Sequence, residues 1–342
     1  MYKAIIRLAD RTLSIPEGET LLEAAMKAGI AYPHGCRSGR CGACKTRLLS
    51  GEVDLLPHTP FSLTADEREQ GLILACRARL QSDIVAKWLA QPKVSHPLVK
   101  TEGVVAAIER LTHDILELRL RLDAPLAYAP GQYARLTFPG LPPRDYSMAP
   151  SARADELAFH IREVAGGRVS ASIAHRARPG VAVQVQGPYG SAYLREAHTK
   201  PILAVGGGSG LAPILSIVTR AVEADMHQPI HLYFGARDGH DVYGLQQLDA
   251  LMKAHPRLSH HVVLSAANGS TAYRQGFLHE AIAADIDRMV GWKAYVAGPP
   301  VMVEAVGQVC RERHLSEIDL HVDVFFTPES GSQTTAGAAA GG

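Results

Sequence analysis

Four cysteines in the first quarter of the chain constrain its fold more than any other feature. Three of them, Cys36, Cys41 and Cys44, follow the pattern C-x4-C-x2-C, and Cys76 comes further along the chain. This spacing is that of the four thiolate ligands of a 2Fe–2S cluster. Because thiolate sulfur is the donor that such clusters prefer, one-electron chemistry is the first functional hypothesis for this chain.

Other uses of these cysteines fit less well. Structural zinc sites usually take two ligand pairs at C-x2–4-C spacing, and the chain has one such pair. A disulfide framework belongs to an oxidising compartment, and the N-terminal segment lacks the apolar core of a secretory signal. His34 borders the cysteine loop, but a Rieske ligand set requires paired histidines with paired cysteines. Cys310, the fifth cysteine, lies in an apolar run and is expected to be buried.

The composition excludes several classes of function. A length of 342 residues corresponds to two or three domains, and a hydrophobic content of 46% supports packed cores. A net charge of +1 gives no electrostatic case for binding nucleic acid or a membrane surface. No apolar stretch reaches the ~18–20 residues that are needed to span a bilayer. We therefore expect a soluble, cytoplasmic monomer.

The pattern of apolar residues divides the chain into domains. Residues 1–92 mix strand-like and short helical segments, as in a small α+β domain. Residues 98–197 contain closely spaced alternating segments, which predict an antiparallel β-barrel. Residues 198–328 alternate apolar strands with helices, which predicts an α/β domain with a parallel sheet. A proline-containing linker precedes the barrel, and the Gly/Ala-rich residues 329–342 are expected to form a disordered tail.

Local signals predict individual elements. Thr20 and Thr64 each precede a glutamate by three positions, which is the capping-box pattern of a helix start. The segments Lys3–Ala9 and Ile318–Val322 are expected to be strands.

Two groups of polar residues and glycines follow one another in the central domain. The groups are Arg144, Tyr146 and Ser147, and then His160, Arg162, Gly166, Gly167 and Ser170. The glycine pair opens a predicted helix, where backbone N–H groups and the positive end of the helix dipole attract an anion. A lone Gly-Gly turn is weak evidence for an anion site, but the two groups in this order are stronger evidence.

A second glycine-rich loop, Gly206–Gly210, follows the first strand of the last domain. It departs from the G-x-G-x-x-G fingerprint, and a flexible hinge is the alternative interpretation. A Gly-Pro pair follows a later strand, at the carboxyl end where ligands bind in open α/β sheets. The candidate nucleotide-binding residues are Gly207, Gly208, Gly210, Gly298 and Pro299.

With these motifs in this order, the chain resembles the reductase components of bacterial aromatic-ring-hydroxylating dioxygenases, of the naphthalene-dioxygenase reductase type. More broadly, it is similar to the ferredoxin–NADP reductase superfamily with an N-terminal plant-type ferredoxin. The resemblance covers residues 1 to about 326 and rests also on Pro130-Gly-Gln-Tyr133 and Gly187-Pro-Tyr-Gly190. It implies a multidomain enzyme: a β-grasp-like ferredoxin domain, an FAD-binding antiparallel β-barrel and an NAD-binding α/β domain with a parallel sheet.

The resemblance implies an electron path from NADH to FAD, then to the 2Fe–2S cluster, and then to a Rieske ferredoxin or a terminal oxygenase. The same domains suit the reductase of a diiron monooxygenase of the phenol or methane type. A non-catalytic redox sensor is a further alternative. Arg37, Arg40 and Lys45 surround the cysteine loop and are expected to form a cationic rim that meets acidic residues on the electron acceptor.

The resemblance also implies roles for the flavin-binding residues. Arg144 would contact the flavin diphosphate, Tyr146 would lie against the isoalloxazine or ribityl chain, and Ser147 would hydrogen-bond near flavin N5. His160 and Arg162 would line the ribityl and phosphate side. The pyrophosphate would be held by Gly166, Gly167 and Ser170.

The nucleotide and ring contacts follow in the same way. Asp241 matches the aspartate of NADH-using relatives, with Asp238 second, because a carboxylate there accepts from the ribose 2′-OH. Arg237 is the counter-argument, since it would pair with the 2′-phosphate of NADPH. Ala297 stands where the family usually has a cysteine near the nicotinamide. Phe325 matches an aromatic residue placed near the flavin ring, and a core aromatic is the equal alternative.

Overall fold

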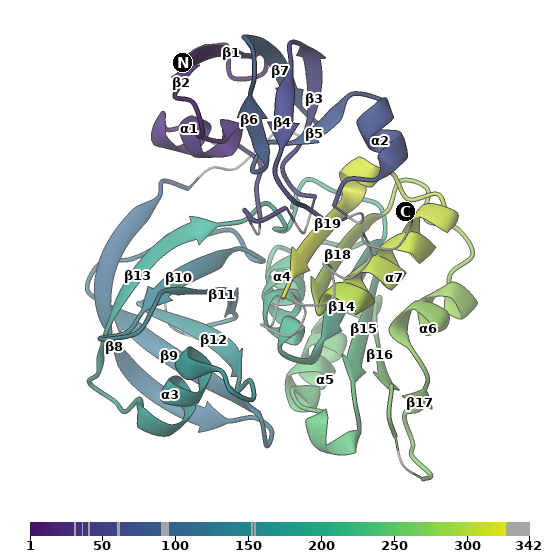
Figure 1. Cartoon of the computed structure of the whole chain (residues 1–342). Helices are drawn as coiled ribbons and strands as arrows, with labels where there is room; N and C mark the ends of the chain where they lie inside the picture. Colours follow the sequence, from purple (N-terminus) through teal and green to yellow (C-terminus); the bar gives the residue numbers. More distant parts are fainter. Residues whose placement is uncertain are drawn as a thin grey trace, which may run out of the picture. The chain divides into compact units, whose positions relative to one another are not determined.

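The computed structural model of the chain describes residues 1–30, 32–35, 37–39, 42–59, 62–89, 96–151, 153, 155–267 and 269–325. The chain divides after Ser95 into two compact units, and each is described by itself (Figure 1). Among the residues that are described, no helix is long and apolar enough to cross a membrane.

The first unit is a small α+β fold, as predicted. Its strands are β1 (Tyr2–Ile6), β2 (Arg11–Ile15), β3 (Lys45–Ser50), β4 (Val53–Leu55), β5 (Leu72–Leu74), β6 (Ala78–Leu80) and β7 (Ile84–Trp88), and its helices are α1 (Leu21–Lys27) and α2 (Ala65–Glu69). Five strands form a mixed sheet in the order β2-β1-β7-β3-β5, and β4 pairs with β6 in a second sheet. Strand β1 runs antiparallel to β2 and parallel to β7.

Both predicted helix starts in this unit are confirmed. Thr20 and Thr64 each accept a hydrogen bond from the backbone of a glutamate three residues later, whose side chain bonds back to the capping residue. The predicted strand Lys3–Ala9 is shorter than expected, because the chain turns after Ile6 and Asp10 adopts a left-handed φ of 48°.

The second unit begins with a closed antiparallel barrel of six strands, which confirms that prediction. The strands are β8 (Val99–Arg110), β9 (Ile115–Leu122), β10 (Tyr133–Thr137), β11 (Arg144–Ala149), β12 (Glu156–Arg162) and β13 (Ala182–Tyr189), and one helix, α3 (Arg168–Arg176), lies between the last two. They close in the order β10-β11-β12-β9-β8-β13. Alternate residues fill the barrel, such as Leu118 on β9 and Phe159 and Ile161 on β12.

The rest of this unit is a six-stranded parallel sheet, also as predicted. Its strands are β14 (Ile202–Gly207), β15 (Ile230–Ala236), β16 (Leu258–Leu264), β17 (Arg274–Gln275), β18 (Lys293–Gly298) and β19 (Leu320–Val324), and its helices are α4 (Leu211–Glu223), α5 (Leu245–Ala254), α6 (Leu278–Asp285) and α7 (Pro300–Glu312), with 3-10 turns η1 (Gly208–Gly210), η2 (Gly239–Asp241) and η3 (Glu317–Asp319). The strand order is β17-β16-β15-β14-β18-β19. Helices α4 and α5 cover one face of the sheet, and α6 and α7 cover the other (Figure 1).

The last strand departs from its predicted bounds. It was expected at Ile318–Val322, but η3 occupies residues 317–319 and the strand starts at Leu320. The domain limits 1–92, 98–197 and 198–328 stay predictions. The tail over residues 329–342 lies outside the described residues, as does most of the linker.

Candidate functional site

Two of the four predicted cluster ligands are described, and the fold brings them together. Cys44 directly precedes β3, and Cys76 follows shortly after β5. These strands pair antiparallel with Lys45 opposite Leu74, so their ends meet, and the amide of Ala75 donates to the Cys44 carbonyl at 3.1 Å. Both thiols are buried. Two buried cysteines at strand ends that meet suit a thiolate-bound cluster.

The loop that carries the other two ligands has a defined backbone where it is described. Cys36 and Cys41 lie outside the described residues. Gly39 and Gly42 both have a left-handed φ of 73°, which a side chain would strain. The Gly39 carbonyl accepts from the amide of Thr59 at 2.9 Å and from the hydroxyl of Ser62 at 2.7 Å. A later segment of the chain therefore clamps this loop, which fits a preformed cluster site.

We predicted a cationic rim of three residues around this loop, and the prediction is wrong for Lys45. The Lys45 ammonium donates to the Glu67 carboxylate at 2.5 Å, and the Lys45 side chain is only 17% exposed. Its charge is balanced within the domain and does not project to a partner. Arg40 lies outside the described residues.

The first flavin motif lies along β11. Tyr146 packs against the barrel core, and burial raises the pKa of its hydroxyl to about 12. Ser147 faces the opposite way and is 8% exposed. Its hydroxyl donates to a carboxylate oxygen of Asp323, on β19, at 2.5 Å. Arg144 is exposed at the start of the strand, where it donates to the Pro143 carbonyl.

Asp323 was not found from the sequence. It is the one carboxylate in the strand Leu320–Val324, where it alternates with Val322 and Val324, and that position was the available signal. Phe325, two residues later, donates its amide to the Gly298 carbonyl at 2.8 Å. The end of the chain's last strand is thereby tied to the carboxyl end of β18, so Ser147, Asp323 and Phe325 belong to one region of the second unit.

His160 and Arg162 lie on the outer face of β12, which packs against the nucleotide loop. His160 Nδ1 lies 3.1 Å from the Tyr243 hydroxyl, and this hydroxyl donates to the Gly208 carbonyl at 3.2 Å. The guanidinium of Arg162 lies so close to Gly208 that a Cβ there would be 2.6 Å from Nη2. Arg162 Nε also pairs with Asp114 at 3.3 Å. The structure therefore places both residues between the barrel and the parallel sheet.

The glycine pair at the start of α3 adopts the predicted helix entry. Gly167 caps the helix without a side chain. Ser170 is 8% exposed, and its hydroxyl accepts from the amide of Val164 at 3.1 Å. Gly166 and Gly167 are thus held in a tight loop whose flavin-binding role stays a prediction.

The two glycine segments of the sheet come together with no space for side chains. Strands β14 and β18 are parallel neighbours, with Gly206 opposite Ala297. A Cβ on Gly210 would lie 2.2 Å from the Ala297 carbonyl oxygen, and one on Gly207 would lie 2.4 Å from Met302 Sδ. A Cβ on Gly298 would lie 2.8 Å from Met302 Cε. The glycines therefore allow the loop after β14 to pack directly against the end of β18 and the start of α7, where Pro299 is the capping residue. This edge is the carboxyl end of the sheet, where dinucleotides bind in open α/β folds.

The carboxylate predicted to bind the ribose is engaged by another residue. Asp241 is 1% exposed, and both its oxygens accept from Arg237, at 2.8 and 2.9 Å. Burial alone raises the pKa of Asp241, but its bonds to Arg237 outweigh burial and lower it. Asp238 is 44% exposed and accepts from the amide of His240 at 2.8 Å.

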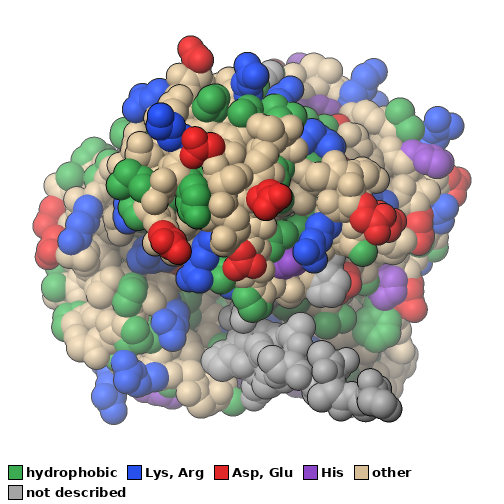
Figure 2. Space-filling view, turned by 45° about the horizontal axis from the view of Figure 1, so that its top comes forward, with side chains coloured by type: hydrophobic (Ala, Val, Ile, Leu, Met, Phe, Trp, Pro, Cys, Tyr) green, Lys and Arg blue, Asp and Glu red, His purple; other side chains and the backbone are tan. Residues whose placement is uncertain are grey.

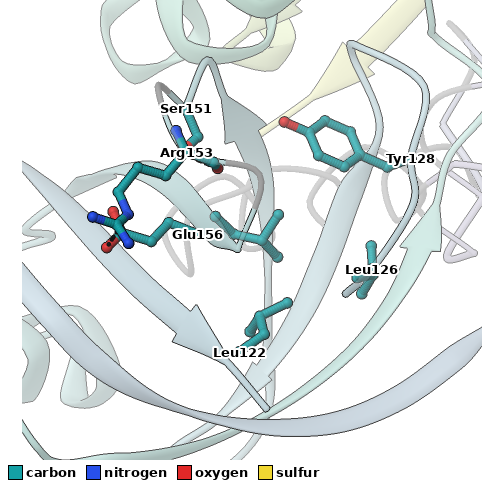
Figure 3. Close-up of a pocket in the computed structure, with 7 residues that line it drawn as sticks. Leu122, Leu126, Tyr128, Ser151, Arg153 and Glu156 are labelled. Carbon is teal, nitrogen blue, oxygen red and sulfur yellow. Dashed lines mark hydrogen bonds and ion pairs between the residues drawn. The ribbon is translucent and has the colours of Figure 1, made fainter. Parts of the chain in front are cut away.

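A cavity of about 290 Å³ lies at one end of the barrel (Figure 3). It is lined by Leu122, Leu126, Tyr128, Ser151, Arg153, Glu156 and Leu157. Apolar side chains form one side, and Arg153 pairs with Glu156 on the other (Figure 3). None of the residues predicted from the motifs lines it, so we do not assign a cofactor to it.

Comparisons with known proteins agree with this arrangement. Residues 6–81 match the 2Fe-2S iron-sulfur cluster binding domain, residues 102–193 the oxidoreductase FAD-binding domain and residues 204–308 the oxidoreductase NAD-binding domain. The chain is 39% identical over 324 residues to the ferredoxin–NAD(P)+ reductase component of the naphthalene 1,2-dioxygenase system of Pseudomonas putida, covering 94% of this chain and 98% of that protein. The chain belongs to this family of oxygenase-system reductases. The reductase is accordingly an oxidoreductase with FAD, NAD and 2Fe–2S sites.

Other relatives show how far the family extends. The reductase is 34% identical to the reductase component of phenol 2-monooxygenase from Pseudomonas sp. strain CF600, covering 97% of this chain and 96% of that one. Among solved structures, the Amycolatopsis cytochrome P450 reductase GcoB superposes with a TM-score of 0.77 at 33% identity, covering 95% of this chain and 99% of that one. The ferredoxin reductase in carbazole 1,9a-dioxygenase gives 0.70 at 29% identity, with coverages of 95% and 98%.

Proposed function

We propose that the reductase passes electrons from NADH, through FAD and the 2Fe–2S cluster, to a Rieske ferredoxin or terminal oxygenase of an aromatic-ring dioxygenase system. The observation that carries this proposal is its near full-length similarity to the naphthalene-system reductase. The similarity to the phenol monooxygenase component is lower, at 34%, so a diiron partner is the second candidate. Supplying purified Rieske ferredoxin plus oxygenase, or a diiron hydroxylase, and measuring NADH-dependent product formation separates the two.

In this proposal, different residues bind the cluster, the flavin and the nucleotide. FAD, when bound, accepts a hydride from the nicotinamide and releases electrons one at a time, which couples the nucleotide to the cluster. The four cysteines would hold the cluster. The flavin would be held by Arg144, Tyr146, His160, Arg162, Gly166, Gly167 and Ser170. The glycines at the ends of β14 and β18 admit the nucleotide, and Ser147 keeps its proton oriented toward Asp323.

We expect NADH to be preferred to NADPH by at least about tenfold in kcat/KM. Two carboxylates, those of Asp114 and Asp241, accept hydrogen bonds from the exposed guanidinium of Arg237, and a third, that of Asp238, follows Arg237 in the chain. A 2′-phosphate would be repelled there, whereas a ribose hydroxyl is neutral. Steady-state ferricyanide reduction with each nucleotide gives the ratio. A preference for NADPH would refute this part of the proposal.

We expect Ser147→Ala to lower kcat for NADH–ferricyanide reduction about tenfold, because the hydroxyl that is aligned by Asp323 is lost from the proposed flavin site. Ser151→Ala is the matched control, since the Ser151 hydroxyl hydrogen-bonds to the backbone of the nearby Arg153, beyond the end of the same strand. Stopped-flow reduction of the bound flavin measures the step directly. An unchanged rate in Ser147→Ala would place the flavin ring elsewhere.

Partner docking does not follow from a charged patch on the face shown in Figure 2. Basic and acidic side chains are interspersed over that face. With Lys45 engaged by Glu67, any electrostatic contribution of the cysteine loop to acceptor docking would come from Arg37 and Arg40.

A further inference from the structure

One arginine joins the barrel to the nucleotide-binding sheet. Arg237, directly after β15, donates from Nε and Nη2 to both oxygens of Asp241. The same Nη2 donates to Asp114 at 2.9 Å. Asp114 belongs to the turn between β8 and β9 of the barrel, so this bond crosses between the two halves of the second unit. The Arg237 side chain is 54% exposed, whereas that of Asp114 is 17% exposed.

Arg237 lies at the position in the fold where the ribose 2′ group of a dinucleotide is recognised. Strand β15 is the parallel neighbour of β14, which ends in the glycine loop. In doubly wound sheets, the residues after the second strand read the ribose 2′ position: a carboxylate suits the hydroxyl of NADH, and an arginine suits the phosphate of NADPH. Arg237 is therefore the natural partner of a 2′-phosphate.

We propose that Asp114 sets the preference for NADH over NADPH, by holding Arg237 against Asp241. This inference rests on the proposed use of NADH. A phosphate is best bound by two parallel N–H groups of one guanidinium. Asp241 fills the Nε–Nη2 edge of Arg237, and Asp114 also accepts from Nη2, so no pair of parallel N–H groups of Arg237 is left for a phosphate. Asp114 is thus a positioning residue, supplied by the barrel, for a selectivity that is read in the other domain.

The charged side chains around Arg237 support the same conclusion. Asp114 and Asp241 balance Arg237 and Arg162, which also pairs with Asp114. The group as a whole offers no surplus positive charge to a phosphate dianion. Replacing the Asp114 carboxylate by an amide leaves one unbalanced positive charge and offers Nη2 a neutral amide oxygen in place of a charged carboxylate. The structure also explains why the nearby trio of His113, Asp114 and Asp241 is not assigned a metal: arginines occupy the carboxylates.

The test compares Asp114→Asn with Glu163→Gln. Glu163 is a matched control because its amide donates to the Asp114 carbonyl at 2.7 Å, yet its carboxylate binds Arg110 and His175 instead of Arg237. We expect the NADPH/NADH ratio of kcat/KM to rise about tenfold in Asp114→Asn and less than about twofold in Glu163→Gln. An equal rise in both would show a bulk charge effect and overturn the proposal.

Inhibitors and a second substitution make the test independent of turnover. Asp114→Asn should bind 2′,5′-ADP more tightly relative to 5′-AMP, Asp114→Glu should restore the wild-type ratio, and adding Arg237→Ala should remove the gain. In the wild-type background, Arg237→Ala should cost NADPH no more than NADH. A selective loss for NADPH there would show that Arg237 already reads the phosphate, and would refute the role of Asp114 even if Asp114→Asn fails to fold.

The two proposals fail in different ways. A wild-type preference for NADPH refutes the use of NADH and the inference with it. A wild-type preference for NADH, with an unchanged ratio in a folded, flavin-loaded Asp114→Asn, refutes only the role of Asp114.

Discussion

Cys76→Ser is expected to abolish cytochrome c reduction, by on the order of 100-fold or more, and to leave NADH–ferricyanide reduction intact. Serine replaces a soft thiolate by a hydroxyl that binds iron poorly, at a buried position beside Cys44. The flavin and nucleotide motifs belong to the other compact unit, which begins at His96. Iron and flavin content, measured with the two activities, test the result.

Cys310→Ser is the matched control for this substitution. Cys310 is a fully buried thiol on α7 of the second unit, and a helical serine can hydrogen-bond to a carbonyl of the preceding turn. We expect it to retain both the iron and cytochrome c reduction. Loss of flavin together with iron in Cys76→Ser would contradict the independence of the two units.

Gly210→Ala should lower NADH-dependent ferricyanide reduction by on the order of 100-fold, the effect of displacing a site by about 1 Å. The new Cβ would lie 2.2 Å from the Ala297 carbonyl oxygen and 2.6 Å from its carbon, which belong to the backbone of β18. Gly210 has an ordinary φ of −63°, so the cost is steric. Overpacking of this kind also destabilises by about 1–3 kcal/mol. Nucleotide titration and thermal unfolding measure the two effects.

Gly239→Ala is the control for a glycine in the same domain. A Cβ on Gly239 would have no atom within 4 Å, and the φ of this residue is not left-handed. We expect unchanged melting and activity within about twofold. Full activity in Gly210→Ala would show that β14 and β18 separate easily, and would remove the argument for a rigid glycine-only loop.

Local chemistry in the sequence was sufficient for the architecture. The capping boxes at Thr20 and Thr64, the alternation of the barrel strands and the apolar strands of the sheet are each determined by nearby residues. Their bounds were less certain where a turn competes with a strand, as after Ile6 and before Leu320. At these two places the extended and the turned backbone differ little in free energy. Pairing with the neighbouring strand then determines where the strand ends or begins.

The sequence alone determined that four cysteines, a run of flavin-type motifs and two glycine segments occur in this order. Only the tertiary structure decided which of these groups meet. The register of β3 with β5 places Cys76 beside Cys44, the packing of β19 brings Asp323 to Ser147, and the β8–β9 turn brings Asp114 to Arg237. The two residues of each pair are distant in sequence. Strand order and packing bring them together, and local propensity does not. For that reason the cluster spacing was readable from the chain, whereas the contact that we propose to control coenzyme selectivity was not.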